Sequence, residues 1–528
     1  MRKPRVASFR VNSHRQRYGP FALHTLPEGL VPDPTGREEL VIKNPATGDD
    51  VCTVVMANQE DVHLAIHYAQ ETFDSGVWSK APAIHRAAVL SVLARNLGER
   101  IHEFARIESM QTGRAIREMT AQLGRLPEWI DYYAALLRTR QDFVAPTQGK
   151  LLNYVQRVPL GVVAQITPFN HPLLIAIKKI APALAAGNSI IVKPSELAPI
   201  SVLEFAEMTI AAGVPPGVLS VLPGHGRTIG KEIVSNPLIR KVDVTAGTDT
   251  GRALGSIVGA NLAAYTAELG GKAPIIVFND ADVQSAVNGA AFACFIASGQ
   301  TCVSGTRLIV QDEIYDVFMT LLLQKIKSIT SRMGNPMNPA STMGTVINHR
   351  QLKRIEQLVQ RPGIGKIIAG GRRLTGHSPL DGFDFSRGSF FPPTVITDIS
   401  TEDDLWREEV FGPVVVVKRF SDEEEGVVLA NACKYGLGAG IWTSDLSRAH
   451  RVAAEIQAGL VWVNTHHRND PSSPWGGMKE SGIGRENGIE ALEAYSQAKS
   501  TIVNIASSEE TREMQDWFAE TDEEKRYG

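Results

Sequence analysis

The sequence predicts an α/β protein with two parallel sheets, and three observations support this fold class. Between residues 173 and 280, short apolar strands alternate with helical stretches that end in glycine. A second series with the same rhythm runs from residue 283 to about 475. The chain has 528 residues, which is too many for a single hydrophobic core. We therefore expect two sheet domains, each covered by helices.

Local sequence patterns predict the helices and strands one after another along the chain. Residues 61–138 repeat apolar positions every three or four residues, which predicts helices. Residues 150–169 alternate and then become continuously apolar, which predicts strands. The later strands are expected at SIIVKP, LSVLPG, KVDVTAG and APIIVFND in the first series, and at RLIV, PTVITDI, PVVVVKRF, GAGIWT and GLVWVN in the second. Residues 360–384 read as a surface connection.

Composition excludes several functional classes. Apolar residues make up 43% and charged residues 21% of the chain, and the net charge of −3 gives no field that would attract nucleic acid or a membrane. No apolar run is long enough for a membrane span. The four cysteines fall in no zinc or disulfide spacing, so we expect free thiols, no metal site and a reducing compartment, the cytoplasm.

The two ends of the chain differ from its middle. The first 19 residues hold six Lys or Arg and no acid, and residues 1–20 are interpreted as a solvated basic arm. A mitochondrial transit segment is the alternative. Residues 507–528 carry eight acids against three bases and form an acidic tail, either a surface helix or a disordered segment.

Three loops in the first series favour nucleotide binding. Ligands collect beyond the carboxyl ends of parallel strands, and Lys193, Ser195 and Glu196 follow such a strand. VTAGTDTG follows another, where Gly247 and Gly251 permit close backbone approach to a phosphate at a helix N-terminus. LPGHGRTIG is a third glycine-rich loop. Each loop taken alone reads equally well as solvated surface.

Three residues carry the candidate chemistry. Cys302 is either a nucleophile or a buried thiol of no chemical consequence, and composition alone favours the second. Glu268 lies at the edge of an apolar strand, where desolvation would raise its pKa toward that of a general base; a surface glutamate before a turn is the alternative. Asn170 lies between two prolines and offers a rigid amide as an oxyanion donor.

Seven ordered stretches resolve the ambiguity at Cys302. They are NPATGDDV, ITPFNHP, VKPSELAP, TAELGGKAP, GQTCVSGTRL, EEVFGPV and PWGGMKESGIGRENG. In this order the chain, from residue 40 to about 505, resembles the NAD(P)-dependent aldehyde dehydrogenase superfamily in its hydrolytic, non-phosphorylating branch.

The resemblance implies a covalent mechanism. Cys302 would attack the aldehyde carbonyl, with the oxyanion held by the Asn170 amide and the Cys302 backbone N–H. The thiohemiacetal would pass hydride to the nicotinamide, and Glu268 would activate the water that hydrolyses the resulting thioester. Lys179 matches a family lysine near the active site. A CoA-acylating dehydrogenase and a non-catalytic NAD-binding homologue are the alternatives; the presence of Glu268 argues against the first.

The resemblance also implies NAD as cofactor, in preference to NADP. Lys193 and Glu196 would hold the adenine ribose, where the Glu196 carboxylate would repel a 2′-phosphate, and Glu409 would hold the nicotinamide ribose. The full set of implied cofactor contacts is Thr167, Pro168, Lys193, Ser195, Glu196, Gly226, Gly247, Gly251, Leu269, Glu409 and Phe411.

Several of the positions that would line the substrate funnel are polar or basic. They are Arg125, His171, Ile175, Lys178, Thr301, Val303, His467, Arg468, Asn469 and Trp475. A buried positive charge is costly without a partner, so we expect a polar or carboxylate-bearing semialdehyde, paired with Arg468 or Arg125. The alternative is that these side chains turn outward to solvent.

The family fold implies three parts and an oligomer. The expected boundaries are 1–142 and 163–270 for an NAD-binding domain, 271–480 for a catalytic domain, and 143–162 and 485–506 for oligomerisation strands. The strands would assemble a homodimer or a homotetramer.

Overall fold

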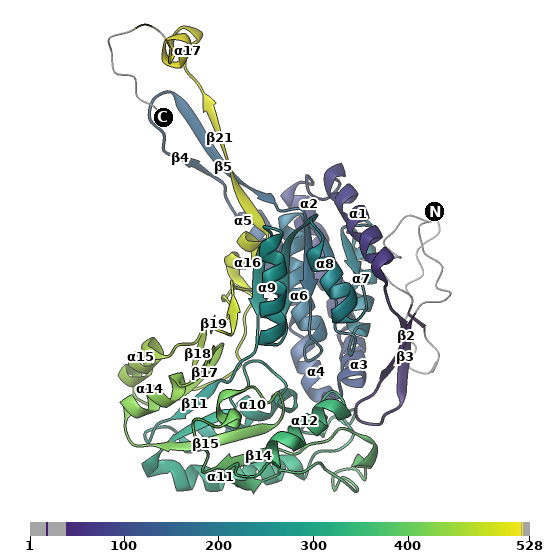
Figure 1. The fold of residues 1–528 in the computed structure, drawn as a ribbon, viewed down its shortest axis with the longest axis vertical. Helices are drawn as coiled ribbons and strands as arrows, with labels where there is room; N and C mark the ends of the chain where they lie inside the picture. Colours follow the sequence, from purple (N-terminus) through teal and green to yellow (C-terminus); the bar gives the residue numbers. More distant parts are fainter. Residues whose placement is uncertain (1–16, 19–37, 519, 521–528) are drawn as a thin grey trace.

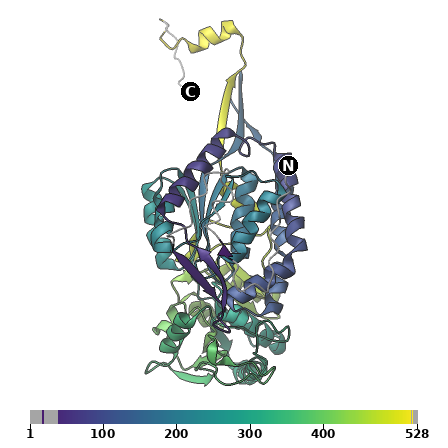
Figure 2. The same ribbon diagram turned by 90° about the vertical axis from the view of Figure 1, so that its right-hand side faces the viewer.

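Two α/β lobes and a projecting β arm make up the protein (Figure 1 and Figure 2). The computed structural model describes residues 17–18, 38–518 and 520. Most of the predicted basic arm and the end of the acidic tail lie outside the described residues. The predicted α/β fold class is confirmed. None of the helices in the described part of the chain combines the length and apolarity that a membrane span requires.

The first lobe is built on a six-stranded sheet in which five strands run parallel. In sheet order the strands are β20 (Gly482–Ile483), β10 (Ala264–Glu268), β9 (Ile239–Thr245), β6 (Val162–Ile166), β7 (Ser189–Lys193) and β8 (Leu219–Val221). β20 is antiparallel to β10 and comes from the far end of the chain. The C-terminal segment therefore closes this sheet beside Glu268.

Helices cover both faces of this sheet. One face packs against α2 (Ala83–Glu99), α3 (Ile101–Thr112), α5 (Leu126–Thr139), α6 (Pro172–Ala186) and α7 (Ile200–Ala212). The other packs against α1 (Gln59–Ser75), α8 (Lys231–Ser235) and α9 (Thr248–Ala260). β6 shows the division, because Val163 faces the first core whereas Val162 and Ala164 face the second.

Local sequence sets the ends of these helices. α1 begins at a capping box formed by Asn58 and Asp61. α6 and α7 end at Gly187 and Gly213, which adopt φ angles of 95° and 107°. Such left-handed backbone favours glycine, so the glycines that close the predicted helices have a conformational reason to be there. The remaining elements of this part of the chain are β1 (Arg17–Tyr18), β2 (Glu39–Lys43) and β3 (Asp50–Val55), which form a small sheet, and the helix α4 (Ile116–Leu123).

The second lobe is built on a seven-stranded sheet. In order its strands are β13 (Lys366–Ala369), β14 (Thr394–Thr397), β15 (Val414–Phe420), β12 (Arg307–Gln311), β11 (Pro274–Val277), β17 (Gly438–Trp442) and β18 (Leu460–Val463). All run parallel to their neighbours except β13. β13 lies within residues 360–384, so the prediction of a plain surface connection there was wrong. This strand has only four residues, two exposed and then two half-buried, so it lacks the alternation that would mark a strand in the sequence.

Helices also cover both faces of the second sheet. α10 (Val283–Phe295) and α11 (Asp312–Thr330) pack on one face. The other face packs against α12 (His349–Val359), α13 (Asp404–Arg407), α14 (Glu423–Asn431) and α15 (Leu446–Glu455). A short pair, β16 (Tyr435–Gly436) with β19 (Met478–Lys479), lies where the chain leaves this lobe.

The arm is a three-stranded antiparallel sheet that projects from the first lobe (Figure 1). β5 (Leu151–Pro159) lies between β4 (Phe143–Ala145) and β21 (Ser496–Asn504), and α17 (Ser508–Gln515) follows at its tip. Within the expected range 485–506 only β21 belongs to the arm, because α16 (Gly488–Ala494) packs into the core of the first lobe.

Candidate active site

Cys302 lies on a sharply folded loop after α10. Ala297, Ser298 and Gly299 all have positive φ angles, of 54°, 54° and 69°, and two successive non-glycine residues in this region imply local strain. A Cβ on Gly299 would lie 2.1 Å from the Gly412 carbonyl oxygen, so the loop presses directly on neighbouring backbone. The surrounding structure thus fixes the approach to Cys302.

The backbone of Cys302 also packs against the segment that follows Glu268. A Cβ on Gly271 would lie 2.1 Å from the Cys302 carbonyl oxygen, which explains a glycine at this position. The Cys302 thiol is half-buried against an apolar cluster that includes Val303 and Trp475. Burial raises its pKa to about 12, and the nearby carboxylates of Glu409 and Glu268 act in the same direction.

The Asn170 amide reaches the Cys302 loop. Its Nδ2 donates to the Gln300 carbonyl at 2.7 Å, and one N–H of the amide remains for another acceptor. The backbone N–H of Cys302 has no hydrogen-bond acceptor among the described residues. Two N–H groups, one on the Cys302 loop and one in contact with it, therefore have no acceptor and match the oxyanion donors that the resemblance implies.

Glu268 is the last residue of β10 and is buried. Its side chain is 3% exposed, and neither carboxyl oxygen has a hydrogen-bond partner within the described structure. Burial first, and then the charge of Glu486, raise the pKa of Glu268 well above its ordinary value. A buried, unpaired carboxyl group with a raised pKa has the properties of a general base.

Lys178 and Lys179 are engaged in buried ion pairs. Lys179 pairs with Asp243 and, at 2.5 Å, with Glu486. Lys178 pairs with the other Glu486 oxygen at 2.6 Å and lies 4.5 Å from the centre of the Trp475 ring. These contacts place both lysines in a buried ion-pair network with Glu486, and the catalytic role of Lys179 and the substrate contact of Lys178 stay predictions. Sequence reasoning missed Glu486, although it lies in the quoted stretch PWGGMKESGIGRENG.

The predicted ribose residues lie together at the end of β7. Lys193 pairs with Glu196 at 3.1 Å, and a Cβ on Gly226 would lie 4.0 Å from the Lys193 Nζ atom. Burial alone would raise the pKa of Glu196, but the Lys193 ammonium lowers it overall. Thr167 donates its backbone N–H to the Lys193 carbonyl at 3.1 Å, while its buried hydroxyl has no partner among the described residues. Pro168 and Ser195 are half-buried beside them.

The N-terminus of α9 is open to an anion. Gly247 occupies the capping position, and no side chain caps the first turn. Gly251 packs against Leu269 so closely that a Cβ there would lie 2.2 Å from a Leu269 methyl carbon. The free N–H groups of this turn are suited to a phosphate.

Glu409 contacts the segment that packs on Cys302, and Phe411 contacts Phe169, the residue before Asn170. The Glu409 carboxylate accepts a hydrogen bond from the Gly271 N–H at 3.1 Å, and burial raises its pKa to about 7. Phe411 meets Phe169 edge to face with 5.7 Å between ring centres. An acid–lysine pair, an orphan buried hydroxyl, an uncapped helix terminus and a second carboxylate together fit a dinucleotide.

The predicted substrate residues divide into buried and exposed groups. Thr301, Val303, His171 and Ile175 are buried, and His171 Nδ1 lies 2.7 Å from Arg114 Nη1. Arg125 pairs with Glu128 at 2.7 Å and donates to the Asn469 carbonyl at 2.8 Å. Arg468 is exposed, and its guanidinium has no carboxylate partner in the described part of the chain.

Arg114 and Glu118 are further residues that sequence reasoning missed. Both are largely buried, at 1% and 10% side-chain exposure, and they form an ion pair. Arg114 Nη1 donates to the Asn170 carbonyl at 3.0 Å, and Glu118 Oε1 accepts from the Ala297 N–H at 3.0 Å. The pair thus joins the loop of the oxyanion donor to the loop of the nucleophile.

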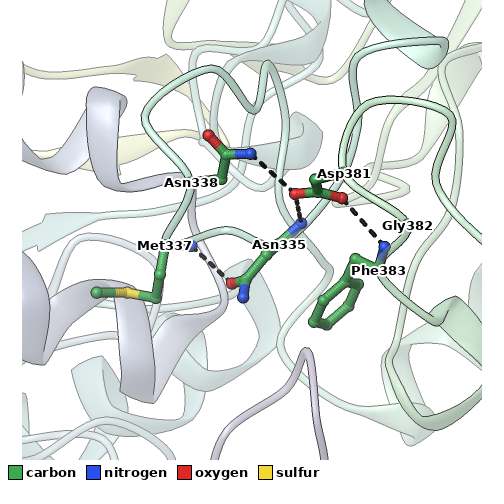
Figure 3. A pocket seen from close by; sticks show the side chains of 6 residues that line it. All are labelled: Asn335, Met337, Asn338, Asp381, Gly382 and Phe383. Atoms are coloured by element: carbon green, nitrogen blue, oxygen red, sulfur yellow. Dashed lines mark hydrogen bonds between the residues drawn. The ribbon is translucent and has the colours of Figure 1, made fainter.

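A separate pocket in the second lobe contains none of the predicted site residues (Figure 3). The Asp381 carboxylate there accepts from the Asn338 amide at 2.9 Å and from the Asn335 and Phe383 N–H groups at 3.1 and 3.2 Å. These contacts hold two loops together, so we assign the pocket no catalytic role.

Comparisons with known proteins agree with the geometry. A family model of the aldehyde dehydrogenase family matches residues 32–501. Among solved structures, PnpE from Pseudomonas sp. WBC-3, in complex with nicotinamide adenine dinucleotide, is 38% identical over 89% of this chain and 95% of its own, with a TM-score of 0.84.

Two further solved structures are similar to this chain over most of its length. Betaine aldehyde dehydrogenase from Staphylococcus aureus, in complex with NAD+, is 34% identical over 93% of this chain and 96% of its own, with a TM-score of 0.88. Indole-3-acetaldehyde dehydrogenase from P. syringae, in complex with NAD+ and IAA, is 33% identical over 89% and 94%, with a TM-score of 0.84. The resemblance deduced from the sequence is confirmed, and the chain belongs to the aldehyde dehydrogenase family.

Proposed function

We propose that this protein oxidises an aldehyde to a carboxylic acid with NAD, through a thioester on Cys302 that water hydrolyses. The observation that carries the proposal is the convergence of three groups around one loop. The Asn170 amide bonds to the carbonyl of Gln300, two residues before the nucleophile, and Gly271, three residues after Glu268, packs on the Cys302 carbonyl.

The first step forms a bond between the Cys302 sulfur and the aldehyde carbon. The carbonyl oxygen becomes an oxyanion, to which Asn170 Nδ2 and the Cys302 N–H donate. The resting thiol is neutral because burial raises its pKa to about 12, so the thiol proton passes to solvent water as the carbon–sulfur bond forms, which the partial exposure of Cys302 allows. Lys193, Glu196 and Glu409 would hold NAD, and the bound cofactor would supply the acceptor for the hydride that leaves the carbon attached to sulfur, so that a thioester on Cys302 remains.

The second step breaks the carbon–sulfur bond. Glu268 takes a proton from water, the water oxygen adds to the thioester carbon, and the Cys302 thiolate leaves. Because no described residue hydrogen-bonds the Glu268 carboxyl group, its oxygens are available to that water. This supports hydrolysis over transfer to CoA, and the retention of Cys302, Glu268 and Asn170 opposes a non-catalytic homologue.

The test compares Cys302→Ala with Glu268→Gln. Cys302→Ala removes the nucleophile, so we expect no NADH formation above background. Glu268→Gln allows the thioester to form but slows its hydrolysis, so rapid mixing should show one NADH per site followed by slow turnover. Wild-type turnover in Glu268→Gln would refute the general-base assignment. A faster rate of NADH formation by the wild type when CoA is added would favour the acylating alternative.

The cofactor proposal is NAD in preference to NADP. Glu196 lies beside Lys193 at the predicted ribose position, and its pKa is lowered, so it is ionised at neutral pH. A carboxylate there accepts hydrogen bonds from ribose hydroxyls and repels a 2′-phosphate. We also propose that the arm assembles a homodimer or homotetramer, because it exposes Phe143, Val144, Ile502 and Ile505 at its surface.

A further inference from the structure

We propose that a basic cleft beside the Cys302 loop binds the anionic end of the substrate, and that the preferred aldehyde carries a carboxylate separated from the aldehyde by an apolar spacer. This inference rests on the proposed function and names the substrate class of the same site.

The cleft lies between α4 and α5 of the first lobe and α10 and α11 of the second, with a volume of about 610 Å³. Its apolar lining includes Trp129, Leu174, Phe292, Phe295 and Ile329. A site of this size with an apolar lining can hold a small organic molecule. The two lobes thus supply its two walls.

Positive charge dominates the polar lining of this cleft. The cations are Arg114, Arg117, Arg125, Lys325, Arg332 and Arg468, and Glu118 is the one acid in the lining. The whole chain has a net charge of −3, so the excess of cations is a local feature. A cleft with one sign of charge and low-dielectric walls attracts ligands of the opposite sign.

Ion pairs account for two of these cations and leave four. Glu118 pairs with the buried Arg114, and Glu128 pairs with Arg125 at 2.7 Å. The remaining cations have no carboxylate partner in the described part of the chain; they are Arg117, Lys325, Arg332 and Arg468. Arg117 lies on α4, Lys325 lies on α11 and Arg332 follows it, and Arg468 lies on the loop after β18. The unpaired cations therefore line the cleft from both lobes.

A line of rings connects the cleft to Cys302. His467 lines the cleft and lies 6.4 Å from Phe292 and 6.2 Å from Trp475, measured between ring centres. Trp475 belongs to the apolar cluster against which Cys302 packs. Burial lowers the pKa of His467 to about 3, so this ring is neutral at physiological pH.

The rings lie between Cys302 and the cations of the cleft, so a ligand that fits both has its apolar part next to the aldehyde and its charged group at the far end. Between the cleft and the Cys302 cluster the neighbouring groups are the rings of Phe292, His467 and Trp475, which suit an apolar spacer behind the aldehyde. Farther out lie unpaired guanidinium and ammonium groups, and arginine binds carboxylates through paired N–H donors. An aldehyde with a distal carboxylate satisfies both regions.

The experiment compares two aldehydes of equal chain length, one ending in a carboxylate and one in a methyl group. For the wild type we expect a kcat/KM at least about tenfold higher for the carboxylate. Arg468→Gln should lower kcat/KM for the charged aldehyde by about ten- to a hundredfold, the range for a lost charge-assisted hydrogen bond, and mainly through KM. The loss for the methyl-terminated aldehyde should be much smaller.

Two controls sharpen the result. Arg372→Gln removes an exposed arginine that does not line the cleft, and it should leave both substrates unaffected. Added salt should reduce the preference for the charged aldehyde, because the Debye length falls to about 8 Å at 0.15 M. Equal kcat/KM for the two aldehydes, or an equal loss for both in Arg468→Gln, would overturn this inference and leave the proposed function intact. If no aldehyde is turned over, the proposed function itself fails.

Discussion

Glu118→Gln is the most informative single substitution outside the reacting groups. The Glu118 carboxylate neutralises the buried Arg114 and accepts from Ala297 N–H at 3.0 Å, while Arg114 holds the Asn170 carbonyl at 3.0 Å. The substituted amide has the same shape and can still accept from Ala297. It carries no charge, so Arg114 loses its countercharge.

The cost can be bounded from these contacts. Removal of one partner of a buried ion pair destabilises a protein by about 3–5 kcal/mol. Arg114 keeps three neutral partners, the Asn170 carbonyl, the Gln122 side chain at 3.0 Å and His171 at 2.7 Å. We therefore expect about 2–3 kcal/mol, near the value of one hydrogen bond to a charged group.

Glu118→Gln should also lower the catalytic rate of the protein that remains folded. The ion pair positions the oxyanion donor relative to the nucleophile, and a displacement of about 1 Å can cost about a hundredfold in rate. We expect kcat to fall at least about tenfold, whereas KM for NAD should stay unchanged because Lys193, at the end of β7, and Gly247, at the start of α9, lie on other elements. Iodoacetamide should also alkylate Cys302 at an altered rate, a readout that general destabilisation would not move in the folded state.

A matched control is the Arg100–Glu103 pair, which is half-buried with a distance of 2.8 Å and lies at the junction of α2 and α3. Glu103→Gln should cost at most about 1 kcal/mol and leave kcat at its wild-type value. Thermal melting and steady-state kinetics on both variants provide the comparison. Wild-type kcat and stability in Glu118→Gln, or equal effects in the two variants, would refute the positioning role.

Three further predictions concern pH, cofactor and assembly. Because the pKa of Cys302 is raised to about 12 and that of Glu268 is also raised, and both act deprotonated, kcat/KM should increase from pH 6 to 10; a flat profile would contradict these roles. Glu196→Gln should increase the ratio of NADP to NAD efficiency by about tenfold, equivalent to 1.4 kcal/mol, and an unchanged ratio would reject the ribose assignment. Ile502→Asp places a charge on an arm residue that is 61% exposed, so light scattering should show a smaller assembly, unless the arm is not an interface.

The positions of the site residues that lie at the ends of strands could be predicted from the sequence. Lys193 and Glu268 each end an apolar run, and in a parallel sheet such ends meet on one edge. The same rule predicted the open turn at Gly247, which caps α9. Periodicity and strand order are local properties, so they can be read without tertiary structure.

The positioning residues left no such local signal. Lys179 and Glu486 are 307 residues apart, Glu118 and Ala297 are 179 apart, and both pairs join different parts of the fold. A lysine on an apolar helix face is equally compatible with a substrate contact and with a buried ion pair. The sequence pattern alone therefore could not predict that Lys178 pairs with Glu486.

Three of the cations around this site differ in burial and in their partners. Lys179 and Arg114 are at most 1% exposed, and each has a carboxylate partner, as an isolated buried charge would be costly. Arg468 is exposed and has none among the described residues. Folding therefore accounts for the paired cations, since without them Glu486 and Glu118 would be buried charges. It does not account for an unpaired arginine in the lining of a cleft that His467 and Trp475 connect to the Cys302 cluster, and an anionic substrate does.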